Sequence, residues 1–251
     1  MDKDYFSGQA VDYQKYRPGY PAALYEFLTS CVPAAPVVWD CATGNGQAAL
    51  PLSAMSAHIV ASDHSTAQLA EAPSAAGVSY VCARAEDMPL PNTCVGLVTV
   101  AQALHWFDFE RFYAEVFRVL KPGGVVAAWT YSFLTVTPQL GTEADAAIRW
   151  FYHEVIGPWW PPERRWVDEQ YQTIPFPFEP ITPPELYIDV EWDLAAVMGY
   201  LSSWSAVALY RQHHHGDPLA LLSERLEKSW GRPTLRRRLR WPLSLRVGRK
   251  S

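Results

Sequence analysis

Cysteine is scarce in this 251-residue sequence, and no C-x-x-C pair is formed by the four that occur, Cys31, Cys41, Cys82 and Cys94. This scarcity excludes a disulfide-dense secreted domain and a cysteine-rich zinc site. No apolar run is long enough to cross a membrane, and the first twenty residues are acidic and aromatic, unlike a signal peptide. We therefore expect a soluble, cytoplasmic protein with no membrane partner.

An excess of positive charge is also missing, because the formal net charge is -5. This balance argues against general affinity for nucleic acid. The basic residues gather near the end of the chain, where most of them would form a solvated edge and Arg246 is a candidate for contacting an anionic substrate. Three consecutive histidines, 213–215, precede a Gly-Asp-Pro turn and cannot share one face, so we predict no metal site.

Short apolar runs alternate with helical patterns between residues 35 and 131. The runs predicted as strands are 37–42, 58–63, 78–83, 95–104 and 124–131, and helices are predicted at 47–56, 66–72 and 107–120. Alternation of this kind predicts a parallel sheet with helices on both faces, joined by right-handed crossovers. The fold class is α/β, a Rossmann-like doubly wound sheet.

The composition changes after Tyr131. Residues 150–185 are dense in tryptophan, tyrosine, phenylalanine and proline, which cannot form one regular element. We predict a partly helical insertion that covers the ligand-binding edge of the sheet. A strand at 186–194, helices at 195–210 and 217–230, and an antiparallel last strand at 239–248 follow. One domain, 1–251, would then contain an N-terminal arm (1–34), a core (35–131), the insertion (132–186) and a C-terminal part that completes the sheet (187–251).

A glycine-rich turn follows the first predicted strand. Its segment Gly44-Asn45-Gly46-Gln47-Ala48-Ala49 fits G-x-G-x-x-G/A. Asp63 follows at about the sequence separation at which dinucleotide-binding units place the acid that binds the ribose. Such a turn lets a ligand approach the backbone at a helix N-terminus. The glycines alone do not distinguish a nicotinamide dinucleotide from another adenosyl cofactor.

Five ordered segments narrow this choice. They are "VVWDCATGNGQ" (37–47), "ASDHSTAQL" (61–69), "ARAEDMPLP" (83–91), "VTVAQALHWFD" (98–108) and "VLKPGGVVAAW" (119–129). In order and spacing the chain resembles the class I S-adenosylmethionine-dependent methyltransferases, in the small-molecule subgroup that includes trans-aconitate methyltransferase. The resemblance implies a methyltransferase enzyme that uses S-adenosyl-L-methionine and releases S-adenosyl-L-homocysteine.

The resemblance also implies a set of cofactor-binding residues: Tyr16, Arg17, Asp40, Ala42, Gly44, Gly46, Asp63, Ala85, Glu86 and Gln102. Asp63 would accept hydrogen bonds from the ribose hydroxyls, although capping of the next helix is an alternative role. Glu86 would accept from the adenine amine, and Gln102 would face the methionine end. In the N-terminal arm, Arg17 would pair with the cofactor carboxylate beside Tyr13 and Tyr16, or the arm is only a rigid turn.

Ala42 departs from the pattern of that family, because it replaces the first glycine of the loop. An alanine side chain avoids the left-handed backbone region. We therefore predict a negative φ at Ala42 if the loop is unstrained, and a positive φ would mark strain at the cofactor site.

Methyl transfer from a sulfonium mainly requires alignment and exclusion of water. A base is needed only if the acceptor must lose a proton. His105, after the fourth predicted strand, is the candidate base, but packing and hydrogen bonding at a strand–helix junction is the favoured role. Candidate substrate residues are Trp159, Trp160, Arg164, Tyr171, Trp204 and Arg246.

The expected partner is a small-molecule methyl acceptor. Carboxyl O-methylation of an acidic metabolite is the first prediction, and S-methylation of a small thiol is the alternative. A nicotinamide-dependent oxidoreductase and a noncatalytic cofactor-binding protein are the rival classes. We expect a monomer or a weak homodimer.

Overall fold

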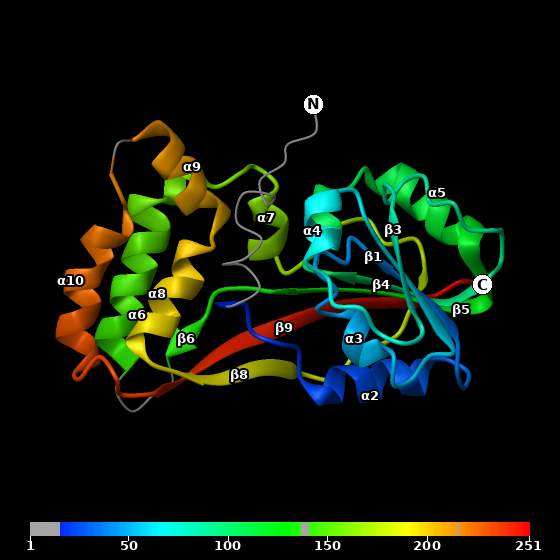
Figure 1. The fold of residues 1–251 in the computed structure, drawn as a ribbon, viewed down its shortest axis with the longest axis horizontal. Coiled ribbons are helices and arrows are strands. Elements are labelled where there is room, and N and C mark those ends of the chain that lie inside the picture. The colour runs from blue at the N-terminus through cyan, green and yellow to red at the C-terminus, as the bar shows by residue number, and fades with distance from the viewer. Residues whose placement is uncertain (1–15, 137–140, 215) are drawn as a thin grey trace. The chain divides into compact units, whose positions relative to one another are not determined.

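The computed structural model describes residues 16–136, 141–214 and 216–251 (Figure 1). These residues form two compact units. Of the described residues, the helical unit contains 16–18, 133–136, 141–164, 187–214 and 216–242, and the sheet unit contains 19–132, 165–186 and 243–251. The insertion predicted as one segment, 132–186, is therefore divided between the two units. Tyr13 and the rest of the predicted arm before Tyr16 lie outside the described residues.

The sheet unit is built on strands β1 (Val37–Cys41), β2 (His58–Asp63), β3 (Val78–Cys82), β4 (Val95–Ala101), β5 (Leu120–Tyr131) and the end of β9 (Arg237–Arg249). The strand order is β3-β2-β1-β4-β5-β9. The first five strands pair in parallel, and β9 pairs antiparallel with β5, from Val125 opposite Arg249 to Tyr131 opposite Leu243. The short strand β7 (Glu179–Pro180) also pairs with β9. The predicted doubly wound sheet with an antiparallel last strand is confirmed.

Helices cover both faces of this sheet. Helices α2 (Ala22–Cys31) and α3 (Ala49–Leu52) lie on one face and α5 (Phe109–Val119) on the other, and the short helices α4 (Thr66–Ala70) and α7 (Arg164–Asp168) complete the set (Figure 1). Helix α3 is shorter than the predicted 47–56. Asp108 caps α5, because its side chain accepts from the amide of Arg111 at 3.2 Å.

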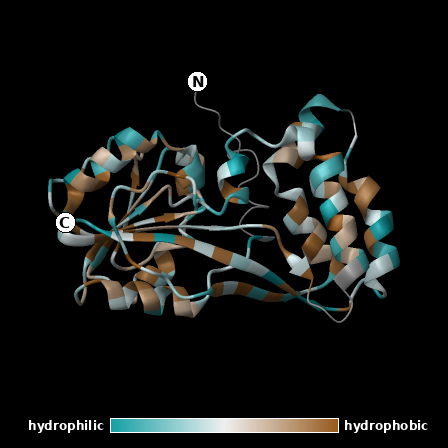
Figure 2. Cartoon of the chain, turned by 180° about the vertical axis from the view of Figure 1, so that it is seen from behind, coloured by the Kyte–Doolittle hydropathy of each residue, from teal (hydrophilic) through white to brown (hydrophobic). Residues whose placement is uncertain are grey.

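The core of the sheet unit joins α5 to the strands and to the second half of the insertion. Trp39, Phe112 and Val116 are fully buried there, together with Tyr171. Burial of side chains from β1, from α5 and from the second half of the insertion supplies apolar area that stabilises the unit. Along β9, buried and partly exposed residues alternate, which appears as bands of different hydropathy in Figure 2.

The helical unit contains α6 (Gly141–Trp150), a π-helical turn (Phe151–Val155), a 3-10 turn (Gly157–Trp159), α8 (Leu194–Ser202), α9 (Ser205–His213) and α10 (Leu219–Trp230). Strands β6 (Thr135–Val136) and β8 (Leu186–Trp192) pair with β9. The prediction of one helix at 195–210 is wrong, because the chain turns at Ser203 and Trp204. The Ser203 hydroxyl donates to the carbonyl of Tyr200 at 2.6 Å, a local bond that competes with helix continuation. Among the described residues no helix is long and apolar enough to cross a membrane.

Candidate cofactor site

The glycine-rich loop joins β1 to α3 at the carboxyl end of β1. Its backbone is left-handed at three positions, with φ of 52° at Ala42, 59° at Gly44 and 84° at Gly46. The φ of Gly46 favours glycine, and a Cβ there would also lie 2.6 Å from the hydroxyl oxygen of Tyr80, so a larger residue would displace the end of that side chain. The φ of Ala42 is positive and not negative, so the loop is strained at the candidate cofactor site.

Ala42→Gly should therefore stabilise the protein. Glycine adopts a left-handed φ without the Cβ penalty, and we expect the free energy of unfolding to rise by about 1 kcal/mol. Urea unfolding measures this change. Ala23→Gly, in the exposed part of α2, is the matched control and should lower the free energy of unfolding by about the same amount. A loss of stability in both variants would contradict the strain at Ala42.

Asp63, at the end of β2, connects two loops through its carboxylate. One oxygen accepts from the amide of Gly44 at 2.8 Å, and the other accepts from the amide of Ser65 at 2.9 Å. The alternative that Asp63 caps the following helix is wrong, because the Ser65 side chain accepts from Gln68 and occupies the cap. Each carboxylate oxygen has a second lone pair, so Asp63 still has acceptor capacity toward a ligand.

Asp40 is completely buried under the loop. Its two oxygens accept from the hydroxyls of Thr43, at 2.6 Å, and Thr99, at 2.7 Å. Burial raises the pKa of Asp40 to about 6, although both hydroxyl bonds act in the opposite direction. Nearby, the hydroxyl of Tyr25 is buried and has no hydrogen-bond partner among the described residues. Burial raises the pKa of Tyr25, and the charge of Asp40 adds to the rise. Asp40 therefore connects the glycine-rich loop, through Thr43, to β4, through Thr99.

Stability should depend on the protonation of Asp40. Because its folded pKa, about 6, is above the unfolded value, its contribution to stability is complete below about pH 4 and is lost as the pH rises through 6. Asp40→Asn removes this slope. Relative to the wild type, the variant should gain about 2–3 kcal/mol in unfolding free energy between pH 4 and pH 7. Urea unfolding at both pH values measures this gain, and an equal difference at the two values would contradict the assignment.

The segment after β3 carries the predicted adenine-contacting residues. Ala85 is buried, and Glu86 accepts from the amide of Asp108 at 3.2 Å and lies 3.6 Å from the guanidinium of Arg84. The carboxylate of Glu86 thus faces the junction that follows β4. Ala85 and Glu86 lie in the same unit as the glycine-rich loop and Asp63.

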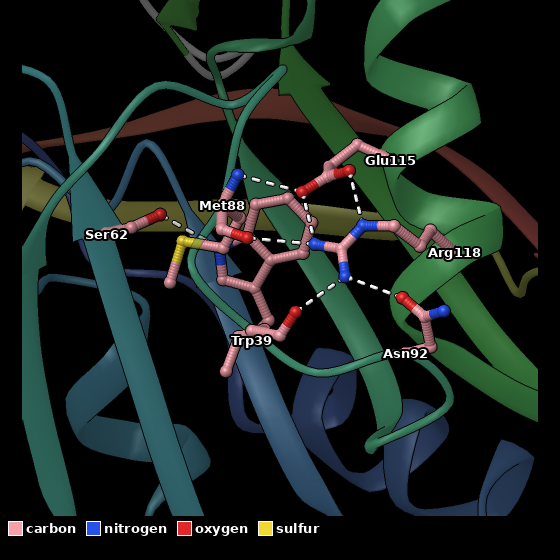
Figure 3. A network of polar contacts seen from close by, with 7 residues as sticks. Trp39, Ser62, Met88, Asn92, Glu115 and Arg118 are labelled. Carbon is pink, nitrogen blue, oxygen red and sulfur yellow. Dashed lines mark hydrogen bonds and ion pairs between the residues drawn. The ribbon is translucent and has the colours of Figure 1, made fainter.

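An arginine network, not anticipated from the sequence, holds this segment against α5 (Figure 3). Arg118 donates to both carboxylate oxygens of Glu115, to the carbonyls of Met88 and Leu90, and to the side chain of Asn92, at 2.5–2.9 Å. Glu115 also accepts from the amide of Met88 at 2.8 Å. Hydrogen bonding to Arg118 lowers the pKa of Glu115. The only signal in the sequence is an i, i+3 acid–base pair, which is common on exposed helices.

Gln102, at the carboxyl end of β4, has a left-handed backbone with φ 54°. Its side-chain oxygen accepts from the hydroxyl of Thr130, at 2.9 Å, and from the amide of Tyr131, at 2.8 Å. These bonds tie the end of β4 to β5. The predicted strand 95–104 ends at Ala101 because the backbone turns at Gln102.

Three predicted residues outside the cofactor set, His105, Tyr171 and Arg246, contact one another in the sheet unit. His105 lies in a 3-10 turn (Leu104–Trp106) after β4, and its Nδ1 is 2.7 Å from the hydroxyl of Tyr171. Arg246, predicted to meet an anion, donates to the carbonyls of Tyr171 and Gln172. His105 and Tyr171 are both buried and are therefore part of the packed body of this unit.

The remaining predicted residues belong to the helical unit. Tyr16, Arg17, Trp159, Trp160, Arg164 and Trp204 all lie there. Arg17 donates to the carbonyl of Ser203 at 3.1 Å, and Arg164 donates to the hydroxyl of Tyr152 at 2.8 Å while stacking over Trp160. Trp204 packs 5.5 Å from Trp160. The structure thus gathers an aromatic and arginine-rich cluster within this unit.

No group of three or more histidine, cysteine or acidic side chains in the described part of the chain is arranged to hold a metal ion.

Comparison with known proteins gives a consistent set of relatives. Residues 39–128 match a family described as a methyltransferase domain. A Dictyostelium discoideum protein provisionally named a methyltransferase is 31% identical over 229 residues, 90% of this chain and 86% of the relative. The solved structure of an Anaeromyxobacter dehalogenans protein, provisionally described as a type II methyltransferase, is 41% identical, covers 93% of this chain and 98% of its own, and has a TM-score of 0.85. A Mycobacterium tuberculosis protein named an uncharacterized methyltransferase is 36% identical over 119 residues, 48% of its length.

A doubly wound sheet with a glycine-rich loop after β1 and an acid at the end of β2 defines a Rossmann-like, nucleotide-cofactor type of protein. The relatives above narrow this class of protein to one family. The chain belongs to the class I S-adenosylmethionine-dependent methyltransferases.

Proposed function

We propose that this protein transfers the methyl group of S-adenosylmethionine to the carboxylate of a small acidic metabolite. The observation that carries the cofactor assignment is the connection between the glycine-rich loop and Asp63. The carboxylate holds the amide of Gly44 at 2.8 Å, and the loop backbone is left-handed on both sides of that contact, at Ala42 and Gly46. The loop and the acid are thus already ordered for the ribose and methionine portions of the cofactor.

The residues of the sheet unit fit this cofactor. Gly46 has a left-handed φ of 84° and no side chain, so a ligand can approach its backbone without meeting a Cβ. Asp63 would hold the ribose hydroxyls through its remaining lone pairs, and Glu86 would accept from the adenine amine. When bound, S-adenosylmethionine supplies an electrophilic methyl group, and its sulfur leaves with the bonding electron pair as S-adenosylhomocysteine. The chain itself has to bind, orient and exclude water.

A carboxylate acceptor suits the groups present at the end of β4. It is already ionised at neutral pH and needs no general base. His105, the only base candidate from the sequence, is 7% exposed and already bonded through Nδ1 to Tyr171. Another relative supports oxygen as the acceptor atom. It is named a malonyl-[acyl-carrier protein] O-methyltransferase, from Alcanivorax borkumensis, and is 36% identical over 92 residues, 29% of its length.

A labelling experiment tests the proposal. The protein is incubated with S-adenosylmethionine carrying a radioactive methyl group and with a panel of small carboxylic acids, thiols and phenols. Carboxyl methylation gives label that alkali releases as methanol, because esters hydrolyse and thioethers and aryl ethers do not. Label in an alkali-stable thioether would support S-methylation instead. Binding of S-adenosylhomocysteine with no labelled carboxylic acid in the panel would overturn carboxyl methylation while leaving the cofactor assignment intact.

A further inference from the structure

Segment 84–92, which follows β3 at the carboxyl edge of the sheet, contains two prolines. Pro89 and Pro91 have no amide hydrogen, so the segment cannot form a regular ladder with a neighbouring strand. Its carbonyl groups need donors from elsewhere in the unit, because unpaired backbone groups away from water are unfavourable. The position of this segment therefore depends on side chains of another element.

Arg118, on α5, supplies donors to this segment (Figure 3). Its guanidinium donates to the carbonyl of Met88 at 2.8 Å and to that of Leu90 at 2.6 Å. Glu115, one turn earlier on the same helix, accepts from the amide of Met88 at 2.8 Å. Lysine could not make these contacts together, since only a guanidinium has five N–H donors in one plane. The pair from α5 therefore fixes the backbone of the segment on both sides of its first proline.

The position of Glu86 depends on where Met88 is held, because the two residues are only two positions apart. Residues this close along the chain lie within about 7 Å of each other. Met88 and Ala85 are both buried in the core that includes α5. The carboxylate of Glu86 is 8% exposed and accepts at 3.2 Å from the amide of Asp108, the cap of the same helix. Helix α5 thus supports the residues that the proposed function assigns to the adenine.

We infer that Arg118 and Glu115 are positioning residues for the base of the cofactor: through segment 84–92 they hold the carboxylate of Glu86 toward an exocyclic amine and make the site selective for adenine. This inference rests on the cofactor part of the proposed function. A carboxylate accepts hydrogen bonds and donates none, so it favours an amino group over a carbonyl group at this position of a purine. The preference requires a fixed carboxylate, because one that can swing away neither gains the hydrogen bond nor repels the carbonyl.

Calorimetry with two ligands that differ only in the base tests the inference. S-Adenosylhomocysteine carries an exocyclic amine, and S-inosylhomocysteine carries a carbonyl oxygen in its place. We expect the wild type to prefer the adenine ligand by at least about tenfold, the value of one hydrogen bond to a charged group. Arg118→Met should reduce this preference to within about threefold, mainly by weakening binding of the adenine ligand. Glu115→Gln keeps an acceptor for the amide of Met88 but loses the ion pair, so its preference should lie between the two.

The base preference separates positioning from a general loss of stability, provided that each variant is measured well below its melting temperature. Lys250→Met is the matched control, because Lys250 donates to the carbonyls of Phe117 and Leu120 at the end of the same helix and outside the segment. It should lower stability but keep the full preference. Glu86→Gln should lose the preference, since an amide can accept or donate. Adding Arg118→Met to that variant should then change the preference no further.

Three results would overturn the inference and leave the cofactor assignment intact. The first is an Arg118→Met variant with the base preference of the wild type. The second is a wild type that binds both ligands equally, because the carboxylate of Glu86 would then not distinguish the bases. The third is an equal loss of preference in Lys250→Met, since any weakening of α5 would then suffice. A wild type that does not bind S-adenosylhomocysteine would instead contradict the proposed function, and the inference with it.

Discussion

Asp63→Ala should remove the rise in melting temperature that S-adenosylhomocysteine gives to the wild-type protein. At a ligand concentration of about 100 times Kd, binding adds about 2.7 kcal/mol to the unfolding free energy. For a chain of this length that is a rise of about 5–10 °C. Loss of the carboxylate removes the proposed acceptor of both ribose hydroxyls and the bond to the amide of Gly44. Hydrogen bonds to a charged group contribute about 1.5–3 kcal/mol each, so we expect affinity to fall by at least about 100-fold.

The measured quantity is the increase caused by the ligand, because Asp63→Ala also lowers the stability of the free protein. Asp87→Ala is the matched control, since Asp87 is an exposed acid beside Glu86 and its side chain should remain in solvent. The control should keep the full increase in melting temperature. Calorimetry that finds unchanged affinity in Asp63→Ala would contradict the assignment of Asp63 to the ribose.

Arg118→Met should be the most destabilising of the surface-charge substitutions considered. The guanidinium joins Glu115 to two loop carbonyls and to Asn92, and Glu115 is only 11% exposed. Methionine retains part of the apolar stem but leaves a nearly buried carboxylate without its cation. The contribution of these charged hydrogen bonds is reduced by solvent, because Arg118 is 33% exposed. We therefore expect the free energy of unfolding to fall by about 2–4 kcal/mol. The melting temperature would fall by about 5–15 °C.

Lys228→Met provides the comparison for Arg118→Met. Lys228 pairs with Glu224 on α10, and both side chains are about three-quarters exposed, at 74% and 76%. A helical surface pair contributes only about 0.3–0.5 kcal/mol. Thermal unfolding of the two variants therefore separates a network from an isolated pair. Equal, small effects would show that the bonds of Arg118 to the loop do not contribute to stability.

The parts of the fold that repeat locally could be predicted from the sequence. Apolar runs of strand length, separated by helical periods, correctly gave the parallel strands, and the alternation from Trp241 to Val247 gave the antiparallel last strand. The five motifs identified the family. The helix predicted at 195–210 was wrong, because its apolar pattern continues through Ser203 and Trp204 although the backbone becomes extended at Trp204.

The details of the site depend on contacts between distant residues, which a periodic pattern does not encode. The φ of Ala42 is imposed by the turn between β1 and α3 and not by alanine itself. Arg118 resembles an ordinary surface residue until the carbonyl of Met88, thirty positions away, is placed beside it. Tyr171 fitted the composition of a ligand-lining wall, yet its hydroxyl is bonded to His105. For each of these residues the sequence indicates the chemical type of the side chain, but it does not indicate which distant residues surround it.

The loop amides held by carboxylates have a consequence for hydrogen exchange. Gly44 and Ser65 donate to Asp63, and Met88 donates to Glu115, so none of these three amides is protected by a strand-to-strand ladder. Exchange at such amides requires only a side chain to swing away, whereas exchange in the central strands requires the sheet to open. A ligand that occupies Asp63 should therefore slow exchange at Gly44 and Ser65 before it affects any strand. These amides would report occupancy of the site separately from the stability of the fold.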